Sequence, residues 1–324
     1  MKALLCESYG PPANLKYREV DNPTAGPGEV LLRVRVCSVN FPDTLIIRGK
    51  YQVRPPLPFA PGSDVAGDVL AVGPGVTHLQ AGDAVVALTR VGGFAEQLVV
   101  PASNCFPKPP DMSYEVAAAF LMAYGTSYHA LKDRAQLQAG ETLLVLGASG
   151  GVGLAAVELG KALGARVIAA ASTPDKLEFC RQHGADDTIL YTTEDLKSRA
   201  KELTGGKGVD VVYDPVGDRF SEPALRALAR GGRHLVVGFA AGDIPRIPLN
   251  LTLLKECAIV GVFFGNFSKY EPKKFQRNIG ELLQFFARGQ LKPHIHARYP
   301  LERGAEALEA IARREVRGKA VVLC

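Results

Sequence analysis

Short apolar runs alternate with polar turns over the first 120 residues of the chain. Turn signals rich in glycine and proline, such as AGPGE and VGPGV, separate the runs, and the runs have the length and composition of strands. Many short strands with few helices predict a β-rich, barrel-like unit. The strands expected in this unit cover residues 29–39, 63–73, 82–88 and 93–100.

The pattern changes near residue 115, beyond which apolar runs alternate with helix-like segments. The runs are almost continuously apolar, which is typical of parallel strands that are buried on both faces. The alternation therefore predicts an α/β fold with a doubly wound, Rossmann-type parallel sheet. Its strands are expected at 141–148, 165–172, 187–191, 209–217, 233–240 and 257–264, with helices between the first five at 151–164, 175–184, 193–206 and 219–232. The tail adds helices at 276–289 and 301–315 and a strand at 319–324.

Composition narrows the class of protein without changing this picture. A length of 324 residues suggests two domains. The net charge of +5 is spread along the chain, which favours a solvated surface over a nucleic-acid footprint. No apolar run has the length of a membrane span, and the first residues lack a signal-peptide pattern. We therefore expect a cytoplasmic protein without a nucleic-acid or membrane partner.

Cysteine and histidine spacing predicts no metal site. Six cysteines are scattered along the chain with no CxxC pair and no Cys/His cluster at zinc spacing. Structural disulfides are not expected in a chain of this size and compartment. The run HIH at 294–296 has the spacing of two ligands on a strand face, but an exposed strand or loop is favoured there.

A glycine-rich loop lies between the expected strand at 141–148 and the helix that follows it. A pyrophosphate needs close backbone approach, free N–H groups and a helix N-terminus, and this strand–turn–helix context supplies all three. Ala148 replaces the first glycine of the common GxGxxG pattern. The candidate dinucleotide-binding residues are Ser149, Gly150, Gly151, Val152 and Gly153.

The end of the next strand indicates which dinucleotide is bound. An acid about 20 residues past the glycines would bond the ribose 2′-hydroxyl of NAD, but the first acid here is Asp175, which lies inside the following helix. Ser172, Thr173 and Lys176 stand in its place and suit a 2′-phosphate through hydroxyl donors and positive charge. We therefore expect NADP(H); the alternative for Lys176 is an ordinary exposed helix residue.

Several further motifs together resemble a known family. The chain is similar to the zinc-free quinone oxidoreductase branch of the medium-chain dehydrogenase/reductases, which includes zeta-crystallin, and especially to the group called quinone oxidoreductase-like protein 2. The resemblance covers essentially the whole chain. The motifs that carry it are VNFPDTLIIRGKY (39–51), PFAPGSDVAGDVLAVGPGV (58–76), YGTSYHAL (124–131), GASGGVG (147–153), GVDVVYDPVG (208–217) and NLTLLKECAIVGVFFG (250–265).

The resemblance implies a domain organisation and an assembly. It implies a GroES-like β-rich catalytic domain over 1–120, completed by 266–324, and an NADP-binding Rossmann domain over 121–265. The active site would lie between them. Relatives dimerise by joining the last strands of their nucleotide domains, so the apolar run at 257–264 predicts a homodimer.

The resemblance also implies site residues. Asn40 and Tyr51 are expected to line the cleft near the nicotinamide, with Asn40 also in contact with the cofactor. For Asp43 two roles are open, a place in the site or the cap of the helix that follows Pro42. Zinc-dependent relatives place a cysteine where this chain has Asn40 and a histidine where it has Ser63, so no catalytic zinc is expected. The phenylalanines among the further expected residues have two possible roles, as a wall beside the nicotinamide or as ordinary core residues. Further cofactor contacts are expected from Thr126, Tyr191, Gly238, Phe239, Phe263, Phe264, Arg317 and Lys319.

The expected function is hydride transfer by a bound nicotinamide. No Ser–His–Asp set, paired carboxylates or metal cluster is evident in the sequence, so the protein would supply binding and orientation. Without zinc, the natural substrate is a quinone or an α,β-unsaturated carbonyl, with Asn40 as hydrogen-bond donor and Tyr51 as proton donor; a pocket wall with water as donor is the alternative for Tyr51. An enoyl-thioester reductase is the second enzyme hypothesis. A non-catalytic, crystallin-like NADPH-binding protein with a structural or nucleic-acid-binding role is the third.

Overall fold

The computed structural model describes residues 1–324 and divides into two compact units. The first unit comprises Met1–Met122 and Pro293–Cys324, and the second comprises Ala123–Lys292. Residues 266–292, which we expected in the first domain, lie in the second unit. The helix α10 (Pro272–Ala287) makes the contacts that place them there. Tyr128 donates to Glu281, and Lys132 donates to Asn278.

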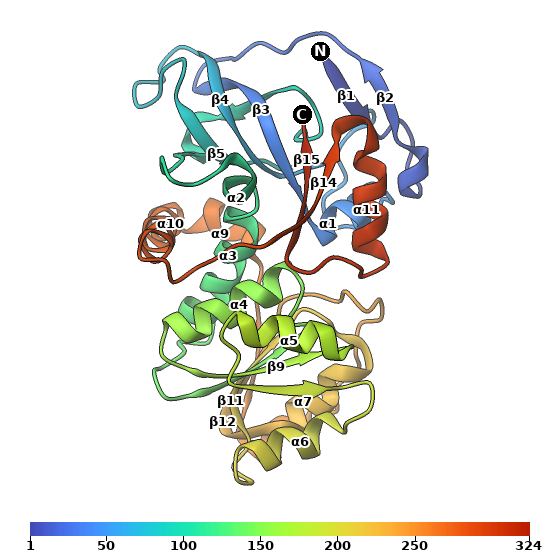
Figure 1. Cartoon of the computed structure of the whole chain (residues 1–324), viewed down its shortest axis with the longest axis vertical. Helices are drawn as coiled ribbons and strands as arrows, with labels where there is room; N and C mark the ends of the chain where they lie inside the picture. Colours follow the sequence, from blue (N-terminus) through green and yellow to red (C-terminus); the bar gives the residue numbers. More distant parts are fainter. The chain divides into compact units, whose positions relative to one another are not determined.

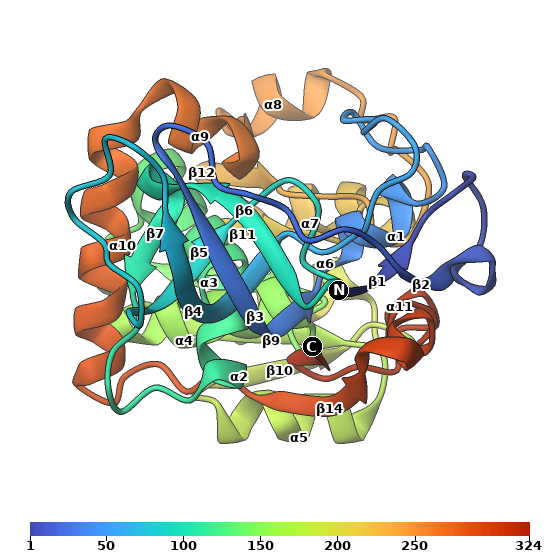
Figure 2. The same cartoon turned by 90° about the horizontal axis from the view of Figure 1, so that it is seen from above.

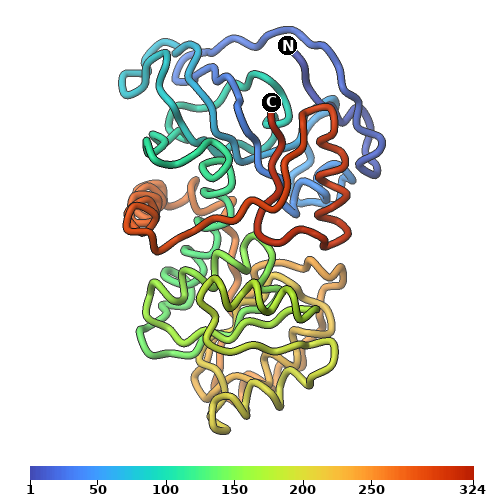
Figure 3. The backbone as a smooth tube through the Cα atoms, in the orientation of Figure 1, coloured from blue at the N-terminus to red at the C-terminus, as the bar shows by residue number.

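A seven-stranded sheet forms the frame of the first unit (Figure 1). The C-terminal β15 pairs antiparallel with β3, and Figure 3 shows the red end of the tube beside the blue strand. Figure 2 shows β3, β4 and β5 side by side. The sheet follows the order β14 (Ile295–Pro300), β15 (Lys319–Leu323), β3 (Glu29–Val39), β4 (Asp64–Val72), β5 (Ala84–Leu88) and β7 (Cys105–Pro107), and β6 (Gln97–Pro101) also pairs with β3.

The remaining elements of the first unit are short. A separate two-stranded sheet pairs β1 with β2, and α1 packs against α11. These elements are β1 (Lys2–Leu5), β2 (Lys16–Glu19), α1 (Phe41–Ile46), α2 (Tyr114–Ala118), α11 (Gly304–Ala312), and the 3-10 turns η1 (Pro12–Asn14), η2 (Ala102–Asn104) and η5 (Leu301–Arg303).

Buried and exposed side chains alternate along the first half of β3, so one face of the strand packs on the core. Val30, Leu32 and Val34 are buried in the core, whereas Arg33 and Arg35 are exposed. A side chain at Gly67 of β4 would place its Cβ 2.0 Å from the carbonyl oxygen of Arg33, so the close pairing of β3 and β4 requires glycine there.

The second unit is built on a six-stranded sheet in which every strand pair is parallel. The sheet follows the order β10 (Asp187–Leu190), β9 (Arg166–Ala171), β8 (Thr142–Leu146), β11 (Val209–Asp214), β12 (Leu228–Val236) and β13 (Ala258–Gly261). The order of the strands reverses between β8 and β11. This is the doubly wound topology that the sequence predicted, and its ligand crevice is expected at the carboxyl ends of those two strands.

Helices connect the strands of the second unit and pack on its sheet. They are α3 (Leu121–Tyr128), which begins at the division of the chain, the π-helical turn η3 (His129–Arg134), α4 (Gly151–Ala162), α5 (Pro174–Gln182), α6 (Leu196–Leu203), the 3-10 turn η4 (Asp218–Phe220), α7 (Ser221–Ala227), α8 (Asn250–Lys255) and α9 (Phe264–Tyr270), followed by α10. None of the helices is both long and apolar enough to cross a membrane.

The last strand of the second sheet is shorter than the apolar run predicted. We expected a strand over 257–264, but β13 covers only Ala258–Gly261, and Phe264 begins α9. The partner strand β12 ends at Val236, opposite Gly261, and the pairing ends with one further bond, from the N–H of Val262 to the carbonyl oxygen of Val236 at 3.0 Å. Hydrophobicity alone therefore overestimated the length of this strand.

Candidate functional site

The glycine-rich loop joins β8 to α4 and lies at the point where the strand order reverses. Gly153 is required by packing, because a Cβ there would lie 2.3 Å from the carbonyl oxygen of Gly147. Gly150 is different, since its Cβ would only touch that oxygen at 3.4 Å. The protein's own atoms thus leave room above Gly150, next to the first-turn N–H groups of Gly151 and Val152. The loop has the geometry of an anion site at a helix N-terminus.

The neighbouring strand β9 ends beside this loop and places Ser172, Thr173 and Lys176 at the same carboxyl edge. Thr173 is the N-cap of α5 and accepts a hydrogen bond from the backbone N–H of Lys176 at 3.4 Å. A cation in the first turn of a helix interacts unfavourably with the helix dipole. The helix dipole therefore does not favour Lys176, whereas its charge is of the sign that suits an anion at this edge.

Aromatic side chains border the same edge beyond β10. Tyr191 follows β10, and its ring lies 4.5 Å from that of Phe220, centroid to centroid. The guanidinium group of Arg219 lies 5.1 Å from the Phe220 ring. The sequence analysis identified Tyr191 but missed Phe220, which follows a glycine turn and has no local motif to mark it.

A buried polar cluster fixes the loop after β11. One oxygen of Asp214 accepts the N–H groups of Val216 and Gly217 at 2.9 and 2.8 Å, and the other accepts from Ser221 Oγ and His234 Nε2 at 2.6 and 3.1 Å. Although burial alone would raise the pKa of Asp214, the bond to His234 and the other donors hold it below its usual value. Serine, histidine and aspartate thus meet here, which the sequence analysis did not foresee. Both partners bind the carboxylate, so the cluster is an anchor for the loop and not a nucleophile relay.

A second buried polar cluster lies in the first unit, where β3 ends and α1 begins. Asn40 is the N-cap residue of α1, and its backbone N–H donates to Asp43 Oδ2 at 2.8 Å. The capping role that was open for Asp43 is therefore present. Lys319, at the start of β15, donates to the carbonyl oxygen of Val39 at 3.1 Å and to Asn40 Oδ1 at 2.5 Å.

Asp64 belongs to the same cluster. Its Oδ2 accepts from Ser38 Oγ at 3.1 Å and from the N–H of Met122 at 3.3 Å, and Ser38 Oγ in turn accepts from Asn40 Nδ2 at 3.4 Å. Asp64 and Asp43 are fully buried, and each keeps one oxygen without a hydrogen-bond partner. The sequence analysis did not foresee that these two buried acids would lie in one cluster.

Burial dominates the acidity of these groups. It raises the pKa of Asp64 to about 7 and that of Asp43 to about 6. Burial lowers the pKa of Lys319, against the attraction of the two carboxylates. Half-buried Tyr51 packs against the core of the first unit, and burial together with the charge of Asp43 raises its pKa. A phenol with a raised pKa keeps its proton at neutral pH and remains able to donate it.

The other expected site residues lie in varied settings. Thr126 is half-buried on α3, and Gly238 and Phe239 follow β12, where Phe239 fits against Gly217. Phe264 is buried beside Phe275, at 5.7 Å between ring centroids, which matches the core role left open for it. Phe263 is 47% exposed.

Two C-terminal residues were expected to reach the cofactor phosphates. Lys319 is not at the surface but bonded to Asn40, as described above. Arg317, in the turn before β15, is half-buried. Its charge adds to the burial that lowers the pKa of His296. The HIH run therefore lies beside a cation, a poor setting for a metal ion.

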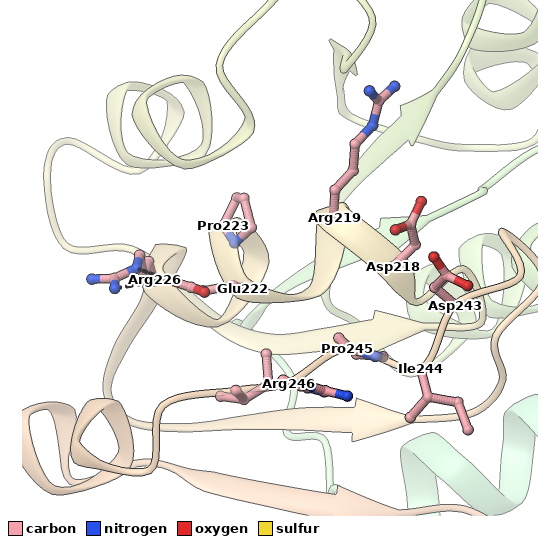
Figure 4. Close-up of a pocket in the computed structure, with 10 residues that line it drawn as sticks. Asp218, Arg219, Glu222, Pro223, Arg226, Asp243, Ile244, Pro245 and Arg246 are labelled. Carbon is pink, nitrogen blue, oxygen red and sulfur yellow. Dashed lines mark hydrogen bonds and ion pairs between the residues drawn. The ribbon is translucent and has the colours of Figure 1, made fainter.

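An open pocket of about 470 Å³ lies elsewhere in the second unit, between η4, α7 and the segment 243–247. Figure 4 shows the carboxylates of Asp218 and Asp243 on one side and the Arg219 side chain directed away from them. None of the predicted cofactor residues lines it. No group of three or more His, Cys, Asp and Glu side chains is arranged to hold a metal ion.

Comparison with known proteins places this geometry in context. A family model described as alcohol dehydrogenase GroES-like domain matches residues 26–110, and one described as zinc-binding dehydrogenase matches residues 151–284. The chain is 39% identical to a quinone oxidoreductase-like protein 2 homolog of Nematostella vectensis, over 99% of this chain and 88% of the relative.

Two solved structures that are titled as NADPH complexes share the fold. Escherichia coli quinone oxidoreductase complexed with NADPH has a TM-score of 0.94 and 30% identity, with 100% of both chains covered. A mycobacterial protein complexed with NADPH has a TM-score of 0.94 and 32% identity, again with 100% of both chains covered.

The buried acids of the first unit predict a dependence of stability on pH. The raised pKa of Asp64 means that the folded protein holds this proton more tightly than the unfolded chain, whose pKa is near 3.8. The free energy of unfolding should therefore fall as the pH rises from about 4 to about 7, by up to about 1.4 kcal/mol per pH unit. Asp64→Asn removes this contribution, so the variant should gain stability relative to the wild type over that range.

Urea unfolding from pH 4.5 to 8 measures this difference. The exposed Asp111→Asn is the control, because it removes a carboxylate from the same unit without removing a buried one. Parallel pH profiles for the wild type and Asp64→Asn would contradict the assignment.

Proposed function

Because the chain belongs to the quinone oxidoreductase branch of the medium-chain dehydrogenase/reductase family, we propose that it is an NADPH-dependent reductase that acts on quinones or α,β-unsaturated carbonyls without zinc. The observation that carries the proposal is the carboxyl edge of β8 and β9. There the N-terminus of α4 has room for a pyrophosphate above Gly150, and Ser172 and Thr173, with Lys176 in the first turn of α5, follow the end of the neighbouring strand β9.

The residues at this edge fit NADPH better than NADH. The hydroxyls of Ser172 and Thr173 and the ammonium group of Lys176 suit a 2′-phosphate. The nearest acid, Asp175, lies in the first turn of α5 and not at the end of β9, where an NAD-binding acid is expected. Tyr191, whose ring is tilted by 47° against that of Phe220, supplies an aromatic surface next to the same edge. The NADPH in the two related structures supports this choice. The bound nicotinamide supplies the hydride.

The first-unit cluster supports reduction of an activated carbonyl compound. Asn40 offers an N–H group and Tyr51 a protonated phenol, and both are donors that suit an acceptor oxygen or a carbon that must receive a proton. Reduction of an enone, enal or enoyl thioester requires such a proton. A quinone requires less help, because its reduced anion can be protonated by water. The enoyl-thioester reaction is therefore the second candidate, favoured by the protonated phenol of Tyr51 in the same unit as Asn40.

We also propose that the protein is a homodimer joined through β13. This strand is the end of its sheet and pairs only with β12, so its second edge is unpaired within the chain. Ile259 on this strand is 39% exposed, and Leu249, Leu253 and Leu254 just before it are more than 70% exposed. An open apolar edge with exposed leucines nearby invites pairing with another chain.

Cofactor choice gives the first test of this function. NADPH should bind more tightly than NADH by at least about tenfold, or ~1.4 kcal/mol, and Lys176→Ala should remove most of this preference. Titration monitored by nicotinamide fluorescence measures both affinities. Lys161→Ala, which removes another α-helical lysine of the second unit, is the control and should keep the preference. Equal affinities in the wild type would refute the NADPH assignment.

Turnover tests the reaction itself. NADPH oxidation should be observed with a panel of quinones and enones, and Tyr51→Phe should lower kcat for the enone by a factor on the order of 10², with only a few-fold change for the quinone. Tyr114→Phe also removes a bonded hydroxyl from the first unit and should leave both rates unchanged. If both substrates instead lose activity equally through a higher KM, Tyr51 only forms part of the wall of the substrate pocket. Tight NADPH binding without turnover on any substrate would favour the non-catalytic alternative.

Light scattering tests the assembly. The wild type should have the mass of a dimer, and Ile259→Glu should produce monomers or aggregates because a charge would be buried at the joined edge. Val72→Glu is a matched control, since Val72 in the first unit has the same 39% exposure. A monomeric wild type would end this proposal.

A further inference from the structure

The side-chain amide of Asn40 has one orientation that its neighbours allow. The lysine ammonium carries only donors, so the atom that faces Lys319 Nζ at 2.5 Å must be the amide oxygen. On the other side, Ser38 uses its single hydroxyl hydrogen for Asp64 Oδ2, so Ser38 Oγ accepts from the amide nitrogen. A flipped amide would place two donors against each other at Lys319.

This orientation determines what Asn40 can offer to a ligand. Its carbonyl oxygen is occupied by Lys319, and one hydrogen of Nδ2 makes only a long 3.4 Å contact with Ser38. The second hydrogen of Nδ2 has no acceptor within the protein. Asn40 is thus a donor and not an acceptor toward a bound molecule.

The charge of Lys319 is directed at the same amide. Lys319 is buried, and its hydrogen bonds go to two carbonyl oxygens, one from Val39 and one from Asn40. Burial lowers the pKa of Lys319, and Asp64 and Asp43 oppose this through space by favouring its charged form. A hydrogen bond from a cation to an amide oxygen draws electron density from the amide nitrogen, and such chains of donors strengthen one another. The N–H group of Asn40 is therefore a stronger donor than that of an ordinary asparagine.

We propose that Lys319 is a positioning residue that acts through Asn40: it turns and polarises the carboxamide so that its N–H group stabilises the substrate oxygen on which negative charge develops. This inference rests on the proposed function. In the step concerned, hydride from NADPH adds to the β-carbon of an enone or a ring carbon of a quinone, and NADP⁺ remains. The π electron pair moves toward the carbonyl oxygen, which gives an enolate. In the quinone case this enolate becomes its tautomer, the hydroquinone anion, when the ring carbon that received the hydride gives up a proton and an oxygen takes one. The proton that completes the product comes from Tyr51 or water.

The role differs from that of a phosphate ligand, which is the alternative for Lys319. A phosphate ligand would affect NADPH binding, whereas a residue that acts on the developing oxyanion would affect kcat. Loss of one preorganised donor to an oxyanion costs about 10²–10³ in kcat. If the donor is kept but is no longer polarised by Lys319, the loss in kcat should be smaller, but still at least about tenfold.

Lys319→Met tests the proposal, with Lys108→Met as its matched control. Lys108 lies in the same unit and also donates to two carbonyl oxygens, those of Pro109 and Met112, but it belongs to neither cluster. We expect Lys319→Met to lower kcat at least about tenfold, with the Kd of NADPH changed less than about threefold, while Lys108→Met keeps kcat within about twofold. A weakened NADPH affinity with kcat retained, an unchanged kcat, or equal losses in the two variants would each overturn it. If Lys319→Met does not fold, Lys319→Gln replaces it under the same criteria.

A spectroscopic measurement separates this inference from the proposed function. In protein labelled with ¹⁵N-asparagine, the side-chain signal of Asn40 is identified by its loss in Asn40→Asp. Polarisation by Lys319 should shift its amide protons downfield, and Lys319→Met or Lys319→Gln should move them back upfield. If the wild type turns over no quinone or enone, the proposed function fails while this shift still tests the inference. An Asn40 signal that is unaffected by loss of Lys319 would overturn the inference even in an active enzyme.

Discussion

The antiparallel pairing of β15 with β3 is the interaction on which the first-unit cluster depends. It places Ala320 opposite Val39 and so brings Lys319, from the end of the chain, to the point where β3 gives way to α1. The same pairing buries the lysine. Without β15, Asn40 would have no partner for its amide oxygen, and Asp43 and Asp64 would lose the cation that offsets part of their burial. One strand pair thus determines the geometry and the charge of the cluster together.

Local patterns were sufficient to predict most of the fold. The parallel strands of the second unit are long apolar runs that need no partner information to be recognised, and the glycine loop has a steric requirement at Gly153 that any strand–turn–helix unit of this kind shares. The predictions were wrong where pairing decided the outcome. The apolar run at 257–264 ends as a strand at Gly261, opposite the end of β12 at Val236. The helix α10 groups with the second unit, where Asn278 and Glu281 make polar contacts that have no sequence signature.

For the same reason, the sequence predicted the β9 edge of the candidate site but not the buried cluster of the first unit. Ser172, Thr173 and Lys176 are close in sequence, so their shared place at the end of β9 follows from the strand itself. Asp64 and Lys319 are separated by most of the chain, and neither stands in a motif that indicates burial. Only the sheet order β15–β3–β4 shows that they face one cluster. The Asp214 anchor was missed likewise, because Ser221 and His234 reach it from different elements.

The charge balance of the first-unit cluster bears on how such a site can act without a metal. Two carboxylates and one ammonium group would carry a net negative charge if all were ionised, and burial opposes this, so the pKa of Asp64 rises to about 7. A proton retained on one acid leaves the cluster neutral, while the ammonium hydrogens point at carbonyl oxygens and not at the carboxylates. In zinc-dependent relatives a metal ligand is expected at the position of Asn40, where the metal would polarise a carbonyl. Here a buried cation reaches the same position through the amide of Asn40, so a hydrogen bond can provide part of the polarisation that a metal ion provides elsewhere.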